Sequence, residues 1–179
     1  MATQQVICAG FGGQGVMSMG QLLTYAGMIE GKNVSWLPSY GPEMRGGTAN
    51  CSVIVSDKLV GSPIVTDATT VIAMNLPSLL KFEKDLVKDG LLLINSSLIE
   101  NKASREDVRA YYIPANEIAV EIGNAKVANM VMLGAFLELT KIVEVESVIA
   151  ALKKVFGPEK AHLLPGNEDA LRKGAEAVK

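Results

Sequence analysis

The residues of this chain best suited to hold a charged group form a glycine-rich turn near the amino terminus. The turn reads Gly-Phe-Gly-Gly-Gln-Gly, and its candidate binding residues are Gly10, Gly12, Gly13, Gln14 and Gly15. Glycine accepts positive φ and allows a ligand or a partner chain to approach the backbone closely. Amide groups at the start of a helix favour a phosphate or a carboxylate. The alternative is a tight turn that binds nothing.

The turn lies between a predicted strand and a predicted helix. Residues 6–9 are an apolar run of strand length, and the apolar residues of 16–29 recur at helical spacing on one face. A strand, a glycine turn and a helix in this order are typical of the first βα unit of a doubly wound α/β domain.

The glycine spacing also matches the dinucleotide-binding pattern, but the rest of that pattern is missing. Such sites have an acidic residue about 20 residues later, at the end of the second strand. Counting selects Glu30, which is predicted to end the first helix, and the second predicted strand, 34–37, runs into Pro38-Ser39-Tyr40 without an acid. The sequence therefore argues against an NAD site.

A second candidate segment covers residues 39–47 and shows no hydrophobic periodicity. Its candidate binding residues are Ser39, Tyr40, Gly41, Glu43, Arg45, Gly46 and Gly47. An arginine beside two glycines can hold a phosphate or carboxylate through two hydrogen bonds. Tyr40 could pack on a ligand or a partner backbone, and Glu43 could orient Arg45. Alternatively, Glu43 and Arg45 form an ion pair that only braces the loop.

Ligands of α/β sheets collect at the carboxyl ends of the strands, so both segments should meet Asn75, which follows a strand at 71–74. These segments contain no recognisable group of catalytic residues. The single histidine, His162, lies outside these segments, and Val16-Met17 stand where a phosphate-binding loop would have Lys-Ser/Thr. The sequence thus predicts a binding rim without catalytic residues.

The alternation of elements predicts the fold. Further strands are expected at 48–56, 91–94 and 111–114, and further helices at 78–87, 115–122, 125–141 and 145–156, with Asn167 capping a last helix. This order is typical of a three-layer, Rossmann-like α/β domain with a mostly parallel sheet and helices on both faces. Residues 1–179 are expected to form a single domain.

Composition limits the partners. Hydrophobic residues make up 49% of the chain, and its mean hydropathy is +0.26. No apolar run approaches the ~20 residues needed to cross a bilayer. The excess of apolar residues therefore suggests an apolar surface buried between subunits and not in a membrane. The net charge of −2, without a basic cluster, argues against nucleic acid as a partner.

The amino terminus lacks signal-peptide features, which predicts a cytoplasmic protein. Cys8 and Cys51, both in predicted strands, are expected to be core side chains, and two cysteines cannot supply the four thiolates of an iron–sulfur cluster.

Together, the two glycine-containing segments carry a family resemblance. Gly-Phe-Gly-Gly-Gln-Gly and Ser-Tyr-Gly-Pro-Glu-Met-Arg-Gly-Gly-Thr at 39–48 resemble the gamma subunits of 2-oxoacid:ferredoxin oxidoreductases. The resemblance continues through 51–56 and 71–75 and, in order and length, over nearly the whole chain. It implies a complex that cleaves a 2-oxoacid oxidatively with thiamine diphosphate, forms an acyl-CoA and CO2, and passes electrons through iron–sulfur clusters to ferredoxin.

The resemblance also implies which subunits hold the cofactors. This chain is expected to hold no cofactor alone, while thiamine diphosphate and the iron–sulfur clusters belong to alpha, beta and delta partners, and ferredoxin meets the complex. The gamma subunit would close against the catalytic subunits and help to form the coenzyme A side of the site. Helix 125–141, apolar almost all round, is a candidate for subunit packing, and the isolated chain could self-associate.

The same resemblance indicates which class of 2-oxoacid the complex uses. The Tyr40–Glu43 loop is more similar to members that use branched-chain 2-oxoacids or 2-oxoglutarate than to pyruvate members, which more often have Arg-Gly-Gly-Gln-Gly where Phe11 precedes Gly12 here. Two other functions stay open at this point. One is a free-standing nucleotide-binding oxidoreductase, and the other is a purely structural assembly subunit.

Overall fold

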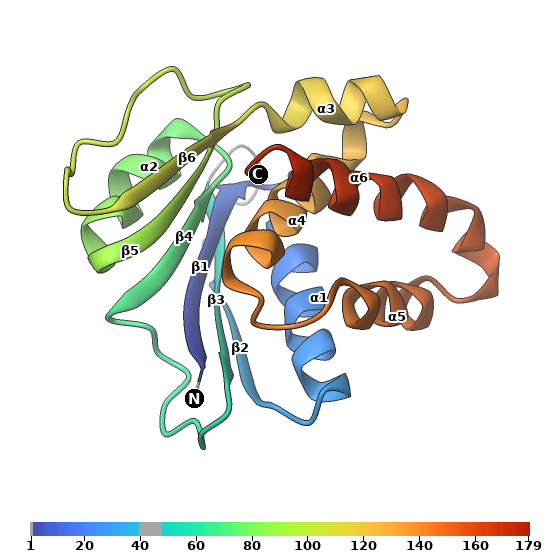
Figure 1. Ribbon diagram of the computed structural model, residues 1–179, viewed down its shortest axis with the longest axis horizontal. Coiled ribbons are helices and arrows are strands. Elements are labelled where there is room, and N and C mark those ends of the chain that lie inside the picture. The colour runs from blue at the N-terminus through green and yellow to red at the C-terminus, as the bar shows by residue number, and fades with distance from the viewer. Residues whose placement is uncertain (1, 40–47) are drawn as a thin grey trace.

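A computed structural model describes residues 2–39 and 48–179 (Figure 1). Its sheet contains six strands in the spatial order β2-β3-β1-β4-β5-β6. The strands are β1 (Thr3–Phe11), β2 (Asn33–Ser39), β3 (Thr48–Ser56), β4 (Ala68–Ala73), β5 (Leu86–Asn95) and β6 (Arg109–Ile113). The helices are α1 (Val16–Ile29), α2 (Leu76–Phe82), α3 (Ala115–Ile122), α4 (Ala128–Thr140), α5 (Val145–Phe156) and α6 (Leu164–Glu176). Short 3-10 turns are η1 (Glu83–Asp85), η2 (Ala125–Val127) and η3 (Pro158–Leu163).

The sheet is mostly parallel, as predicted. β1, β4, β5 and β6 pair in parallel, whereas β3 pairs antiparallel with both β1 and β2, so β3 alone among the six runs in the opposite direction. The sequence explains this reversal. Only residues 40–47 separate β2 from β3, and a crossover between parallel neighbours needs a dozen residues or more.

Helices cover both faces of the sheet, but unequally. α1, α3, α4, α5 and α6 enclose the larger core on one face, and α2 packs against β1 and β4 on the other (Figure 1). The strands explain this division, because successive residues such as Ile7 and Cys8 point into different cores. The predicted three-layer α/β architecture is confirmed.

α4 lies in the middle of the helical layer. Every residue from Ala128 to Leu137 is buried within this chain. A Cβ atom added at Gly134 would overlap the Leu171 carbonyl of α6, so these two helices touch backbone to backbone. The prediction that this apolar helix packs against another subunit is therefore wrong, because the fold of the chain itself covers its apolar surface.

Several element boundaries also differ from the prediction, most clearly at α2, at α6 and in helix 125–141, whose first three residues form η2. α2 ends at Phe82, and Val87, assigned to that helix from the sequence, belongs to β5. Asn167 does not cap α6, because the helix already begins at Leu164 and the Asn167 amide donates to the Leu163 carbonyl (2.8 Å). Pro165 in the first turn supplies the start signal instead. None of the described helices has the length and apolar content needed to cross a membrane.

Candidate functional site

The glycine turn lies at the carboxyl end of β1, where β1 runs into α1. β4 lies parallel to β1 on one side, whereas the chain leaving α1 enters β2 on the other, so the direction of winding changes at this strand. Open α/β sheets bind ligands at such a point. Gly13 (φ 93°) and Gly15 (φ 75°) both have the left-handed backbone that the sequence predicted for this turn.

Gln14 braces the turn from inside. Its Oε1 accepts a hydrogen bond from the Phe11 amide (2.6 Å), and its Nε2 donates to the Met74 carbonyl (3.3 Å). The side chain thereby joins the ends of β1 and β4. A Cβ atom at Gly10 would lie 2.6 Å from Gln14 Oε1 and 2.8 Å from Met74 Cβ, so glycine is required there. Gln14 thus acts as a support of the turn in this chain, and its contact with a ligand stays a prediction.

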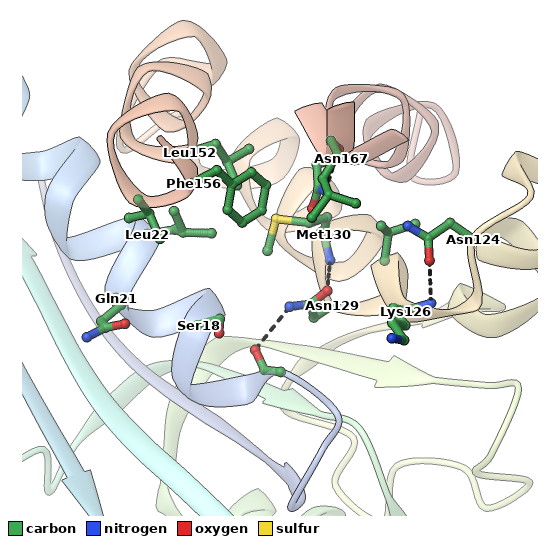
Figure 2. A pocket seen from close by; sticks show the side chains of 14 residues that line it. Ser18, Gln21, Leu22, Asn124, Lys126, Asn129, Met130, Leu152, Phe156 and Asn167 are labelled. Carbon is green, nitrogen blue, oxygen red and sulfur yellow. Dashed lines mark hydrogen bonds between the residues drawn. The ribbon is translucent and has the colours of Figure 1, made fainter. Parts of the chain in front are cut away.

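Asn129 of α4 holds the other end of the turn. Its Nδ2 donates to the Gly15 carbonyl at 3.1 Å (Figure 2), and only 8% of the residue is exposed. A Cβ atom at Gly15 would lie 2.9 Å from Asn129 Cγ and closer still to its Nδ2. Sequence reasoning missed this residue because 114 positions separate it from Gly15 and its local pattern is that of an ordinary helix.

Asn75, the third predicted element of the rim, is at the end of β4 as expected, but it is buried. Its Oδ1 accepts from the Ser78 amide (2.9 Å) and caps α2, and 2% of the residue is exposed. Within the described residues, Asn75 Nδ2 and Ser78 Oγ have no hydrogen-bond partner. Asn75 therefore supports the rim from beneath.

Of the second segment, Ser39 is described. It is the exposed last residue of β2, at the same edge of the sheet as the glycine turn and two strands away from β1, a separation of about 10 Å. The other candidates of this segment, Tyr40, Gly41, Glu43, Arg45, Gly46 and Gly47, lie outside the described residues. Their roles stay predictions.

The structure adds a lysine and an asparagine to the rim. Lys126 in η2 and Asn116 in the first turn of α3 line a pocket of about 210 Å³ together with Gly13 and Gln14, here called the edge pocket. The starts of α1, α3 and η2 thus meet around an exposed ammonium group. The ammonium of Lys126 and the start of α1 favour an anion, so a phosphate or carboxylate suits the edge pocket.

Glu30 lies far from this rim. Its Oε1 accepts from the Glu144 amide and the Ser147 hydroxyl, both at 2.7 Å, at the start of α5. α1 has 14 residues, so Glu30 lies about 20 Å from the glycine turn. This position agrees with the sequence argument against a dinucleotide site.

The two cysteines form a buried pair. Cys8 and Cys51 face each other across β1 and β3, and both are fully buried, which confirms that they are core residues. The hydrogen bond with Cys51 and then burial raise the pKa of the Cys8 thiol well above its ordinary value. The thiol is thus protonated at neutral pH and is not suited to act as a nucleophile. Over residues 2–39 and 48–179, no three His, Cys, Asp or Glu side chains gather as metal ligands would.

The sequence matches the family model for pyruvate ferredoxin/flavodoxin oxidoreductase over residues 5–177. The chain belongs to this family. The resemblance seen in the two glycine-containing segments is therefore confirmed.

Relatives of this chain include separate subunits and longer proteins. The ketoisovalerate oxidoreductase subunit VorA of Methanothermobacter thermautotrophicus is 45% identical over 96% of this chain, which spans 36% of that protein. The 2-oxoglutarate synthase subunit KorC of Methanocaldococcus jannaschii is 34% identical, over 98% of this chain and 94% of the relative. The fold matches the crystal structure of the gamma subunit of a Geobacter sulfurreducens keto/oxoacid ferredoxin oxidoreductase, with a TM-score of 0.83, 29% identity and 98% of each chain covered.

Proposed function

We propose that this chain is the gamma subunit of a 2-oxoacid:ferredoxin oxidoreductase. The complex would convert a 2-oxoacid and CoA to acyl-CoA and CO2 and pass the released electron pair to ferredoxin. End-to-end similarity to KorC and to the Geobacter gamma subunit supports this assignment. The chain spans only about a third of VorA, so the same domain also occurs within longer polypeptides, as expected of a part that works beside others.

The contribution of this chain would be to bind and orient CoA. The observation that carries this proposal is the rim at the end of β1, where Gly13 and Gln14 of the glycine turn, Asn116 of α3 and the Lys126 ammonium line one edge pocket. These groups suit the phosphates of CoA. Ser39, Tyr40, Gly41, Glu43, Arg45, Gly46 and Gly47 would extend the rim from the end of β2.

An iron–sulfur cluster does not fit the residues of this chain. The only two cysteines are buried side by side, and a cluster needs four thiolates. We therefore place the clusters on alpha, beta and delta partners, and we place thiamine diphosphate there with them; these partners would also meet ferredoxin. The assembled complex would act in the cytoplasm.

For the substrate we propose a branched-chain 2-oxoacid or 2-oxoglutarate. VorA is named for ketoisovalerate and KorC for 2-oxoglutarate. The higher identity to VorA, 45% against 34%, favours the branched-chain acid.

The test begins with the complex purified from its native host through a tag on this chain. We expect companions that contain thiamine diphosphate and iron–sulfur clusters, and reduction of a viologen dye that needs both CoA and a 2-oxoacid. A panel of 2-oxoacids then identifies the substrate. A lone chain with a tightly bound nucleotide would instead favour a free-standing nucleotide-binding oxidoreductase.

Two substitutions test whether the rim touches CoA or serves assembly alone. Lys126→Gln and Arg45→Ala should raise the KM for CoA while the complex still assembles. Lys88→Gln is the matched control, because Lys88 is exposed in the first residues of β5, at the opposite edge of the sheet. Loss of assembly with an unchanged KM in the remaining complex would mean that this chain is a structural subunit.

A further inference from the structure

α1 is a surface helix without a charged side chain. Its 14 residues include no Asp, Glu, Lys or Arg, whereas the outer face of a surface helix is ordinarily polar or charged. Tyr25, Met28 and Ile29 lie on one side of the helix, at spacings of three and four residues, and each is at least 40% exposed. This chain therefore leaves an apolar stripe of α1 uncovered.

α5 turns this stripe into one wall of a groove. α5 packs beside α1 (Figure 1), and half of its Val155 is exposed. Val155, Ala151 and Lys154 line a groove of about 280 Å³ together with the three α1 residues, here called the α1–α5 groove. Exposed patches of large apolar side chains mark surfaces that bind another molecule, and Tyr and Met are enriched in such interfaces.

The rim of the α1–α5 groove is positively charged. Lys154 lines it, Lys153 precedes Lys154, and both are exposed. Over residues 2–39 and 48–179, neither lysine forms an ion pair with a carboxylate. Glu30 follows α1, but its Oε1 accepts from the Glu144 amide and the Ser147 hydroxyl, at the other end of α5. The groove therefore combines an apolar floor with cations that no carboxylate of the described chain neutralises.

These properties select the class of molecule that fits. The volume lies just below the range of small-molecule sites, about 300–1,000 Å³, and suits large apolar side chains that project from a helix. Carboxylates on the same helix would pair with the two lysines. A second copy of this chain fits less well, because a two-fold contact would bring the lysines of both copies into one interface.

We infer that the α1–α5 groove docks an amphipathic helix of a partner subunit, which carries large apolar side chains and an Asp or Glu beside them. This inference rests on the proposed function, in which the chain works beside other subunits. Met28 is 13 residues beyond Gly15 and therefore lies about 20 Å along α1 from the glycine turn. The docked helix thus holds the complex together without touching the rim, and α1, not α4, supplies the apolar surface between subunits.

The first experiment uses the complex purified through a tag on this chain. Met28→Lys places a charge in the apolar stripe, and Lys154→Glu reverses the charge at the rim of the groove. Each should weaken the binding of partner subunits about tenfold or more, measured as the concentration at which the complex dissociates in size-exclusion chromatography. The KM for CoA of the remaining complex and the urea denaturation of the isolated chain should not change, because both residues are exposed and far from the rim.

Matched controls are Leu80→Lys in α2 and Lys84→Glu directly after it in η1. Both residues are exposed, and α2 lies on the other face of the sheet. Both variants should leave the complex intact. An intact complex with either groove variant, or equal dissociation in the controls, would overturn the inference, while activity that needs CoA and a 2-oxoacid would still uphold the proposed function. A wild-type chain without companions would overturn both.

The second experiment identifies the docked helix. The photo-crosslinking residue p-benzoyl-phenylalanine replaces Met28 in the purified complex, and mass spectrometry identifies the peptide bound to it. This peptide should come from a partner subunit and contain an Asp or Glu, and changing that acid to Lys should restore assembly with Lys154→Glu. A crosslink to a peptide of this chain would overturn the inference in favour of a second copy.

Discussion

Replacing Gly15 by alanine tests whether the glycine turn is held by α4. Gly15 has φ 75°, and a Cβ atom there would lie 2.9 Å from Asn129 Cγ, where ordinary contacts begin at 3.4 Å. Asn129 must therefore move by about 0.5 Å or more, and the hydrogen bond to the Gly15 carbonyl then breaks or lengthens. The variant thus combines backbone strain with a side-chain clash.

The magnitudes of these two effects can be separated. Left-handed backbone costs an alanine about 1–2 kcal/mol, and overpacking costs about 1–3 kcal/mol, so Gly15→Ala should destabilise the chain by about 2–5 kcal/mol. Gly13→Ala is the control, because Gly13 has φ 93° and a Cβ atom there meets nothing within 4 Å. It should cost only the backbone strain, about 1–2 kcal/mol.

Asn129→Ala removes the clashing side chain and completes a double-mutant cycle. Alone it should cost about 1 kcal/mol for the lost hydrogen bond. Combined with Gly15→Ala it should be less destabilising than the sum of the single changes, by about 1–3 kcal/mol, whereas its combination with Gly13→Ala should be additive.

Urea denaturation of the purified chain, followed by circular dichroism, measures all six proteins of the two cycles. Additivity within about 0.5 kcal/mol in the Gly15 cycle would refute the argument that α4 fixes the turn. Equal coupling in both cycles would refute it as well, because only Gly15 is in contact with Asn129. In the assembled complex, Gly15→Ala should also weaken CoA binding, since the turn amides would shift.

Three further changes test the fold. Gly134→Ala forces α4 away from the Leu171 carbonyl, so urea denaturation should show a free energy of unfolding lower by about 2 kcal/mol or more. In a helix with free space at that position, the same substitution would raise the free energy of unfolding slightly. Glu83→Ala leaves two backbone amides at Ser104 and Arg105 without an acceptor and should cost about 2 kcal/mol, with faster hydrogen exchange in the β5–β6 connection. The hydrogen bond from Lys32 lowers the pKa of Asp57 in the folded chain. The ionised Asp57 therefore stabilises the fold above its unfolded pKa of about 4, and this stabilisation is lost as the pH falls through the folded pKa. In Asp57→Asn, the free energy of unfolding should fall less steeply over this acid range.

Much of the fold was readable from local pattern. The bounds predicted for α1 and β3 agree with the structure, because helical periodicity and strand alternation are strong there and a glycine ends α1. Weaker boundaries failed where long-range pairing decides them. Leu86 follows Phe82 at helical spacing, but pairing with β4 draws the chain from Leu86 onward into β5.

The sequence by itself determined the family, the α/β class and the glycine turn with its positive φ, because these depend on residue type and on spacing along a short stretch. Only the tertiary structure decided what surrounds the turn. Asn129 and Lys126 come from α4 and η2, more than a hundred residues away, and their local patterns are those of ordinary helices. It also decided that α4 is an internal helix, since whether an apolar surface meets its own chain or a partner depends on packing and not on composition.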